Sequence, residues 1–241
     1  MPLGSDAALF AMHATALFVS DDFDRLRYIR EPGDAEADLP LAPRFFMGRT
    51  LKQNIWRFRH DLPDALIAEL EGLCQTEPVA HDLRQPPLHA AHIRAVLQAH
   101  APIKNEYRGP AYWVPDTGPA DSAAVVLDAL DQAVLERHFG WKKIIQPDTD
   151  LGPTTALIVD GVAVSICFCS RIIDAVAEAG VYTIEAARGK GYARAVVSAW
   201  VPAVRQSGRF PLYSASWDNL ASQRIAQSLG MVNYGEDWSI E

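Results

Sequence analysis

The segment Arg188-Gly189-Lys190-Gly191-Tyr192-Ala193 joins a stretch typical of a β-strand to a long Ala/Val-rich stretch typical of a helix. Its two glycines allow the backbone to approach a ligand closely, because neither carries a Cβ atom. A helix that begins here leaves several N–H groups without partners and directs the positive end of its dipole at the loop. With the charges of Arg188 and Lys190, these features predict a pyrophosphate-binding site.

Two common nucleotide-binding motifs do not fit this loop. A P-loop requires Gly-Lys followed by Ser or Thr, whereas Tyr192 follows Gly191 here. A dinucleotide fingerprint requires a third glycine, and the matching position is at or near Val197. Upstream, Asp160-Gly161 separates two apolar runs and predicts a hairpin with a type I′ turn. Such a hairpin indicates antiparallel pairing, whereas a Rossmann unit is built from parallel strands.

The loop resembles the Arg/Gln-x-x-Gly-x-Gly/Ala motif of the GNAT acetyltransferase superfamily and matches it at every defined position. It is followed by a predicted strand and by WDNLASQRIAQSLGM, residues 217–231. That segment is similar to the second signature of the superfamily, in which an Asn (Asn219) is followed eleven residues later by a Gly (Gly230). There is a weaker likeness to acetyltransferases that inactivate antibiotics, such as zwittermicin-resistance proteins.

The resemblance covers residues 109–241 and implies an α+β fold, with a mixed, mostly antiparallel sheet flanked by helices. Within this region, residues 123–139 are expected to form one helix. Residues 1–108 contain alternating polar and apolar stretches followed by helical spacing, which predicts an N-terminal α/β extension. We therefore expect two domains, 1–108 and 109–241. The first is a decayed second copy of the acyltransferase fold, a lid over the acceptor site or a dimerisation unit, and the sequence leaves these roles open.

The resemblance also implies acetyl-CoA as co-substrate and assigns residues to it. The strand before the loop is expected to separate from its neighbour and offer backbone groups to the pantetheine arm. Backbone N–H groups of the loop and first helical turn are expected to hold the pyrophosphate. The start of the last helix completes the site. The expected cofactor-binding residues are Val181, Tyr182, Thr183, Arg188, Gly189, Lys190, Gly191, Tyr192, Ala193, Arg194, Asn219 and Ser222.

The implied reaction is direct attack of an amine on the thioester, with a backbone N–H near Tyr182 stabilising the oxyanion. Glu178 is the candidate general base, because an apolar setting would raise its pKa. A solvent-facing glutamate at a strand end is an equally good interpretation. Many members of the superfamily carry a Tyr seven residues after the Asn to protonate the leaving thiolate, and Ala226 stands there. Tyr213, Tyr234, Ser222 or water are the alternatives for this general acid.

Composition excludes several other classes of function. The net charge of −8 disfavours nucleic-acid binding. The apolar stretch at residues 7–19 is too short to span a bilayer and lacks the basic start of a signal peptide, so we expect no membrane partner and a cytoplasmic location. Three cysteines form no disulfide framework, and no matching Cys or His pair has metal-ligand spacing.

The sequence thus predicts an N-acetyltransferase that acts on a small-molecule amine or an amino acid derivative, as a monomer or a homodimer. Two alternatives stay open. One is a non-catalytic module that binds acyl-CoA, for which Ala226 is the supporting feature. The other is a resistance protein that sequesters its ligand without turnover.

Overall fold

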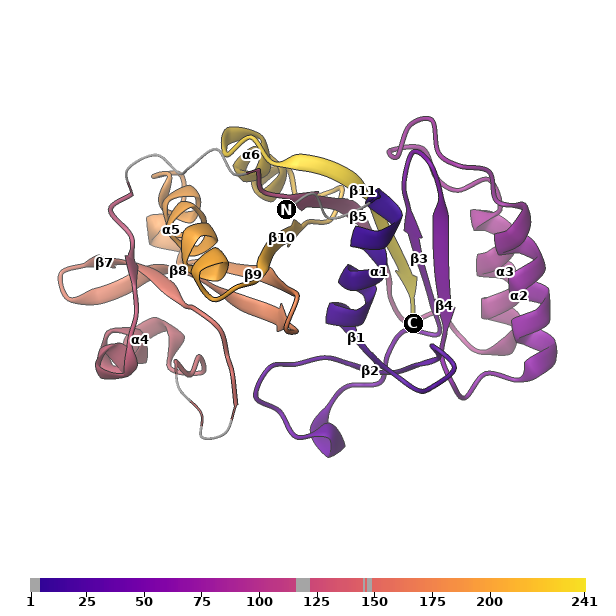
Figure 1. Cartoon of the computed structure of the whole chain (residues 1–241), viewed down its shortest axis with the longest axis horizontal. Coiled ribbons are helices and arrows are strands. Elements are labelled where there is room, and N and C mark those ends of the chain that lie inside the picture. Colours follow the sequence, from indigo (N-terminus) through magenta and orange to yellow (C-terminus); the bar gives the residue numbers. More distant parts are fainter. Residues whose placement is uncertain (1–4, 116–121, 145, 147–148) are drawn as a thin grey trace.

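A single mixed sheet runs through the molecule. The computed structural model describes residues 5–115, 122–144, 146 and 149–241. Over these residues, nine strands form one sheet in the order β4-β3-β11-β5-β10-β9-β8-β7-β6 (Figure 1). Every neighbouring pair is antiparallel except β9 and β10, so the expected fold class is confirmed. The strands are β3 (Phe45–Arg49), β4 (Asn54–Phe58), β5 (Glu106–Trp113), β6 (Val125–Val126), β7 (Thr155–Val159), β8 (Val162–Ile172), β9 (Val176–Thr183), β10 (Phe210–Ser214) and β11 (Val232–Ile240).

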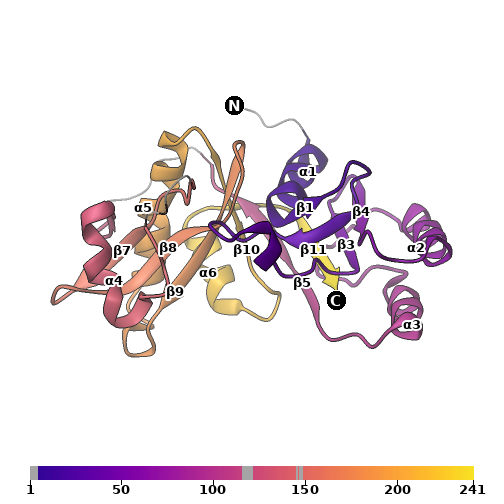
Figure 2. The same ribbon diagram turned by 90° about the horizontal axis from the view of Figure 1, so that it is seen from below.

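Helices cover both faces of this sheet. On one face, α1 packs against β3, β5 and β10, and α4 packs against β7 and β8. On the other face, α2 and α3 cover β3 and β11. Helices α5 and α6 cover the part of the same face that runs from β5 through β10, β9 and β8 to β7. Figures 1 and 2 both show α2 and α3 outside β3 and β4 at one end of the molecule, with α4 at the opposite end. The helices are α1 (Asp6–Leu17), α2 (Asp64–Thr76), α3 (Ala90–His100), α4 (Gln132–Phe139), α5 (Tyr192–Gln206) and α6 (Leu220–Ser228).

Smaller elements complete the chain. A two-stranded ribbon of β1 (Phe18–Ser20) and β2 (Leu26–Ile29) follows α1. Single 3₁₀ turns lie at η1 (Glu36–Asp38), η2 (Ala129–Asp131) and η3 (Glu185–Ala187). The hairpin of β7 and β8 is confirmed: Asp160 and Gly161 have φ of 50° and 76°, as a type I′ turn requires. Among the helices of the described segments, none is long and apolar enough to cross a membrane.

The two parts of the chain share this sheet. Strand β3 pairs with β11 from Phe45↔Ile240 to Arg49↔Glu236. Strand β5 begins at Glu106, ahead of the boundary expected after residue 108, and lies between β11 and β10. The ring of Phe10 on α1 packs against the ring of Tyr234 on β11, with centroids 5.1 Å apart. The division into two domains stays a prediction, but the sheet and its core are continuous across the expected boundary.

The expected helix over residues 123–139 is wrong in its first half. Val125 and Val126 form β6 and pair with β7, and Leu127 donates its N–H to the carbonyl of Thr154. Asp128 then caps the turn η2 by accepting from the N–H of Leu130, and α4 starts only at Gln132. Because a capping Asp marks the start of helical structure, no helix extends N-terminally past Asp128, and the turn η2 leads from this cap into α4.

Candidate functional site

The glycine loop places the start of α5 at the end of β9. Gly189 and Gly191 have φ of +75° and +79°, a conformation that favours glycine, and a Cβ added to either residue would meet no atom within 4 Å. The backbone conformation therefore requires these glycines, and the space above them is open. Helix α5 starts at Tyr192, and its first intrahelical bond runs from the N–H of Ala195 to the carbonyl of Gly191, 3.1 Å. The N–H groups of residues 192–194 are left without intrahelical partners.

A pocket of about 740 Å³ opens at this loop and extends to the start of α6. Of the expected cofactor-binding residues, all except the exposed Lys190 line it. Sequence reasoning missed four further lining residues. Three of them lie on α6: the first directly precedes Ser222, and the other two follow the first by three and four positions, the helical spacing that could have identified them. The four are Ala187, Ala221, Arg224 and Ile225.

Strands β9 and β10 separate next to this pocket. They pair in parallel only from Phe210↔Val176 to Leu212↔Glu178. Beyond this point β9 continues alongside β8, whereas Tyr213 and Ser214 of β10 pair with β5. The opening matches the separation expected for residues 181–183.

Hydrogen bonding decides which backbone groups face the opening. The N–H of Phe210 on β10 bonds to the carbonyl of Ala175, which directs residue 175 toward β10. On the other edge, the N–H of Ile184 bonds to Val164 on β8, 3.0 Å. Because backbone groups alternate sides along a strand, those of Val181 and Thr183 point into the opening and those of Tyr182 point toward β8. The N–H nearest to Tyr182 that faces the opening is therefore that of Val181 or Thr183.

The start of α6 brings three of the sequence candidates together. Asn219 caps the helix, its Oδ1 accepting from the N–H of Ser222 at 3.1 Å. The hydroxyl of Tyr213 lies near Ser222, which lowers its pKa, but burial outweighs this effect and raises the pKa of Tyr213 to about 12. Ala226 is fully buried beside Tyr213 in the same hydrophobic cluster. The other tyrosine candidate, Tyr234, packs on the opposite face of the sheet and bonds to His13 Nδ1, 2.7 Å.

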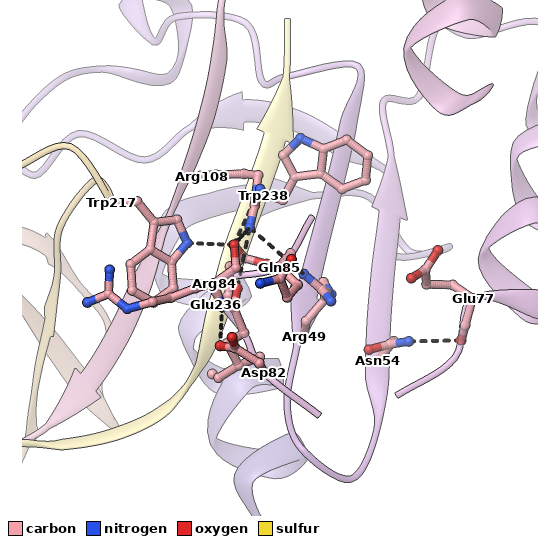
Figure 3. Close-up of polar contacts among 12 residues, drawn as sticks. Arg49, Asn54, Glu77, Asp82, Arg84, Gln85, Arg108, Trp217, Glu236 and Trp238 are labelled. Atoms are coloured by element: carbon pink, nitrogen blue, oxygen red, sulfur yellow. Dashed lines mark hydrogen bonds and ion pairs between the residues drawn. The ribbon is translucent and has the colours of Figure 1, made fainter. Parts of the chain in front are cut away.

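A buried carboxylate anchors the segment that leads into α6. Glu236 on β11 is completely buried and accepts hydrogen bonds from three side chains (Figure 3). The indole Nε1 of Trp217 lies 2.6 Å from it, Nη1 of Arg49 2.5 Å and Nε of Arg108 2.7 Å. Two of these donors, Arg49 and Arg108, come from residues 1–108. That part of the chain therefore helps to position residues 217–219 at the cofactor pocket.

The loop between α2 and α3 adds a second connection to α6. Arg84 stacks on the indole of Trp217, its guanidinium carbon 4.7 Å from the ring centroid. The same guanidinium donates to Oε1 of Gln223 at 3.3 Å, and Gln223 in turn donates to the carbonyls of Ser216 and Trp217. The start of α6 is thus fixed by side chains from both parts of the chain.

Glu178 occupies a buried ionic cluster. It is 5% exposed, so the interpretation as a solvent-facing glutamate is wrong. Its Oε1 lies 3.1 Å from Nε2 of His13 and accepts from the hydroxyl of Ser214 at 2.5 Å. The expected rise in its pKa is also wrong: burial does raise it, but the charge and hydrogen bond of His13 and the bond of Ser214 hold it below its usual value. Burial lowers the pKa of His13. The charge and hydrogen bond of Glu178 outweigh burial, so the pKa of His13 lies above its usual value.

A second pocket of about 580 Å³ lies on the face of the sheet that carries α1 and α4. It meets the cofactor pocket at Val181 and Tyr182, which line both. One wall is aromatic: the ring of Tyr182 stacks on Phe168, with centroids 6.2 Å apart, and meets Trp141 edge-on at 5.3 Å. Glu178 is not among the residues that line either pocket, although its strand neighbour Gly180 lines the second one.

The segment after β2 forms the opposite wall of this second pocket. Glu31, Pro32 and Asp34 line it, and Glu31 is paired with Arg171 on β8, with an N–O distance of 3.0 Å. Part of residues 1–108 thus lines this pocket, and all three roles left open for residues 1–108 stay predictions.

Comparison with known proteins identifies a family to which part of the chain is similar. Residues 150–237 match the sequence profile of the family described as GNAT acetyltransferase, which confirms the resemblance for this part of the chain. The match includes the glycine loop, α5 and α6, and it supports an acyltransferase. Among curated proteins no relative matches the sequence. The weaker likeness to zwittermicin-resistance proteins stays a prediction.

Solved structures with similar folds include three acetyltransferase-like proteins. A putative acetyltransferase of the GNAT family from Novosphingobium aromaticivorans is 16% identical with a TM-score of 0.46, over 57% of this chain and 65% of its own. A GCN5-related N-acetyltransferase-like protein from Streptococcus suis is 16% identical with a TM-score of 0.46, over 83% and 85%. A putative acetyltransferase from Salmonella typhimurium, solved with its cofactor acetyl-CoA, is 20% identical with a TM-score of 0.35, over 49% and 91%. The chain thus spans less than two thirds of the first of these proteins.

Proposed function

We propose that the protein transfers the acetyl group of acetyl-CoA to the amine of a small molecule or an amino acid derivative by direct attack. The observation that carries this proposal is the meeting of the two pockets at Val181 and Tyr182. One pocket offers an open helix N-terminus and glycines, and the other offers a separate space of the size of a small molecule. Three buried free cysteines support the proposal that the protein works in the reducing cytoplasm.

The residues of the first pocket fit a nucleotide with a pyrophosphate. The unpartnered N–H groups at the start of α5 face an opening that no Cβ fills at Gly189 or Gly191. Arg188, Arg194 and Arg224 line the same pocket and add positive charge for the phosphate oxygens. The pantetheine arm is proposed to lie along the open edge of β9, where Val181 and Thr183 offer backbone groups. Acetyl-CoA supplies the activated acetyl group at the end of this arm.

The remaining roles follow from the meeting of the pockets. The amine enters from the second pocket, and the N–H of Val181 is the proposed donor to the oxyanion that forms on attack. Glu178 stays only the sequence-based candidate for the general base, because it lines neither pocket and its lowered pKa makes it a weaker base than an ordinary glutamate. Tyr213, whose hydroxyl lies near Ser222 of the cofactor pocket, is the candidate acid for the leaving thiolate.

Calorimetric titration with acetyl-CoA tests the proposal. The wild type is expected to bind with micromolar affinity, and Gly191→Glu is expected to weaken binding by at least about tenfold, or 1.4 kcal/mol. The added carboxylate would place negative charge in the pyrophosphate site and strain the backbone. Gly208→Glu is the matched control. Gly208 also has a positive φ, +84°, and open space above it, but it lies beyond the other end of α5.

The titration, together with an acetylation assay, distinguishes the proposed acetyltransferase from a non-catalytic module that binds acyl-CoA. Absence of acetyl-CoA binding by the wild type would contradict the proposal, and so would equal weakening by the two glycine variants. Binding without acetylation of any amine in a library would instead favour the non-catalytic acyl-CoA module, with the buried Ala226 as its structural support.

A further inference from the structure

One lysine in the second pocket, named the acceptor pocket from here on, is buried and has no counter-ion among the described residues. Lys142 lines this pocket and is only 7% exposed. Its Nζ lies 4.6 Å from the centroid of the Phe168 ring, which belongs to the aromatic wall of the pocket. Over the described part of the chain, no carboxylate lies within ion-pair distance of this ammonium group. Burial lowers its pKa, as removal of an ammonium group from water does.

The other cations that line this pocket are placed differently. Arg171 is neutralised by Glu31, with which it forms an ion pair at 3.0 Å. Lys143 is exposed, so water already solvates its charge. Lys142 is therefore the buried positive charge of this pocket that lacks a partner within the described residues. A buried and unpaired charge is costly, and an anion that enters the pocket would recover part of that cost.

We propose that the acceptor carries a carboxylate that binds to Lys142, with its apolar part against Trp141 and Tyr182. This inference rests on the proposed acetyltransferase function and narrows its substrate class to amines that also bear a carboxylate. A single unpaired ammonium group matches the single charge of a carboxylate. Trp141 and Tyr182 are 57% and 55% exposed, so both rings offer free surface to an apolar group. The amine end of the acceptor then lies toward Val181, where the pockets meet.

Two probes that share an indole ring test this subsite without turnover. Indole-3-acetate carries the carboxylate, and indole-3-ethanol carries a neutral hydroxyl in its place. In calorimetric titrations the wild type is expected to bind the acid at least about tenfold more tightly, because a contact between two charged groups is stronger than one to a neutral hydroxyl. Lys142→Met keeps the apolar stem and removes the charge, and it is expected to bind both probes equally weakly. Lys142→Arg is expected to restore part of the preference.

Lys104→Met is the control for the loss of one positive charge. Lys104 is exposed, lies outside the pocket and pairs loosely with Glu241 at 3.9 Å, so this variant is expected to keep the preference for the acid. Equal affinity of the wild type for the two probes, no binding of either, or an equal loss of both in Lys142→Met would overturn the inference. Thermal unfolding of each variant checks that its fold is intact.

Acetyl-CoA titrations of the same samples separate this inference from the function on which it rests. A preference for the acid that depends on Lys142, without acetyl-CoA binding, would retain the anion subsite and reject the acetyltransferase. Acetyl-CoA binding without a preference for the acid would retain the acetyltransferase and reject the subsite.

Discussion

At the scale of single residues, Ala226 and Tyr213 show how a side chain from a different element can occupy the same region. The family signature leads one to expect a phenol on α6, and Ala226 supplies only a methyl group there. Tyr213 on β10 packs in the same hydrophobic cluster and places its hydroxyl against Ser222, which lines the cofactor pocket. With its pKa raised to about 12, this phenol keeps its proton at neutral pH and can donate it.

Tyr213→Phe is therefore expected to lower kcat by about 100-fold, because general acid catalysis typically contributes this much. The KM for acetyl-CoA is expected to stay unchanged, since the hydroxyl acts on the leaving thiolate. Steady-state rates of thiol release measure both. Tyr112→Phe is the control: Tyr112 faces Tyr213 across the β5–β10 pair, with ring centroids 6.5 Å apart. A kcat of Tyr213→Phe equal to that of Tyr112→Phe would show that the phenol is not the acid.

Features of the site that depend on one short segment could be predicted from the sequence, whereas features that depend on contacts between distant segments could not. The glycine loop and the Asn219 signature led to most of the cofactor-pocket residues, because each motif sits in one short segment. The charge state of Glu178 could not be inferred, because His13, its ionic partner, lies 165 residues away. The role of Lys142 was missed for a similar reason: its burial depends on packing against Phe168.

At the scale of elements, α1 fits the sheet through two glycines. The ring of Phe10 lies over Gly48 of β3 and Gly235 of β11. A Cβ on Gly235 would stand 2.3 Å from Cε2 of Phe10 and 2.5 Å from the carbonyl oxygen of Arg49. Neither distance is sterically allowed, so the close packing of the helix on the sheet depends on these two positions.

Gly235→Ala is expected to lower the free energy of unfolding by about 1–3 kcal/mol or more, as overpacking of a core does. Gly72→Ala is the matched control, and it is expected to change the stability in the opposite direction. Gly72 lies inside α2 with no atom near its added Cβ, so alanine is expected to stabilise the protein by about 0.5–1 kcal/mol. Urea unfolding measures both. A Gly235→Ala variant as stable as the wild type would show that α1 moves away from the sheet at little cost.

Elements were predictable where their signals were local. The hairpin of β7 and β8 was predicted because Asp160-Gly161 is itself the turn. The helix over residues 123–139 was wrong because its apolar pattern continues through Asp128, which acts as a cap. The pairing of β3 with β11 has no local signal, since Arg49 and Glu236 are 187 residues apart.

At the scale of the whole molecule, three ionisable groups meet beneath α1. His13, Glu178 and Asp237 come from α1, β9 and β11, and all three are buried. Burial raises the pKa of Asp237 to about 7, with the charge of Glu178 adding to the effect against the opposing charge of His13. The folded protein thus keeps a proton on Asp237 up to near-neutral pH, whereas an unfolded aspartate loses it near pH 4.

This difference gives stability a definite dependence on pH. As pH rises from about 4 to 7, the folded state binds the extra proton, so the contribution of Asp237 to the free energy of unfolding falls. Asp237→Asn removes this dependence. Relative to the wild type, the variant is expected to gain stability progressively over that range, to a few kcal/mol, and to keep a constant gain above about pH 7.

Chemical denaturation at a series of pH values measures this gain. Asp22→Asn changes an exposed carboxylate and is the control for the loss of one carboxylate charge. A gain for Asp237→Asn that is the same at pH 4 and pH 8 would contradict the assignment of the proton to Asp237.

The position of β11 between β3 and β5 also fixes an order of events during synthesis. Phe45 and Met47 of β3 pack with Trp238 and Ile240 of β11, which the ribosome makes roughly 190 residues later. At about 5–20 residues per second, that separation corresponds to roughly 10–40 s of translation. Throughout this interval the edge of β3 lacks its native neighbour, a state in which unpaired strands attract other chains and chaperones. Strand β3, the first strand of the nine-stranded sheet to be translated, therefore pairs with β4 early and receives its other neighbour, β11, last.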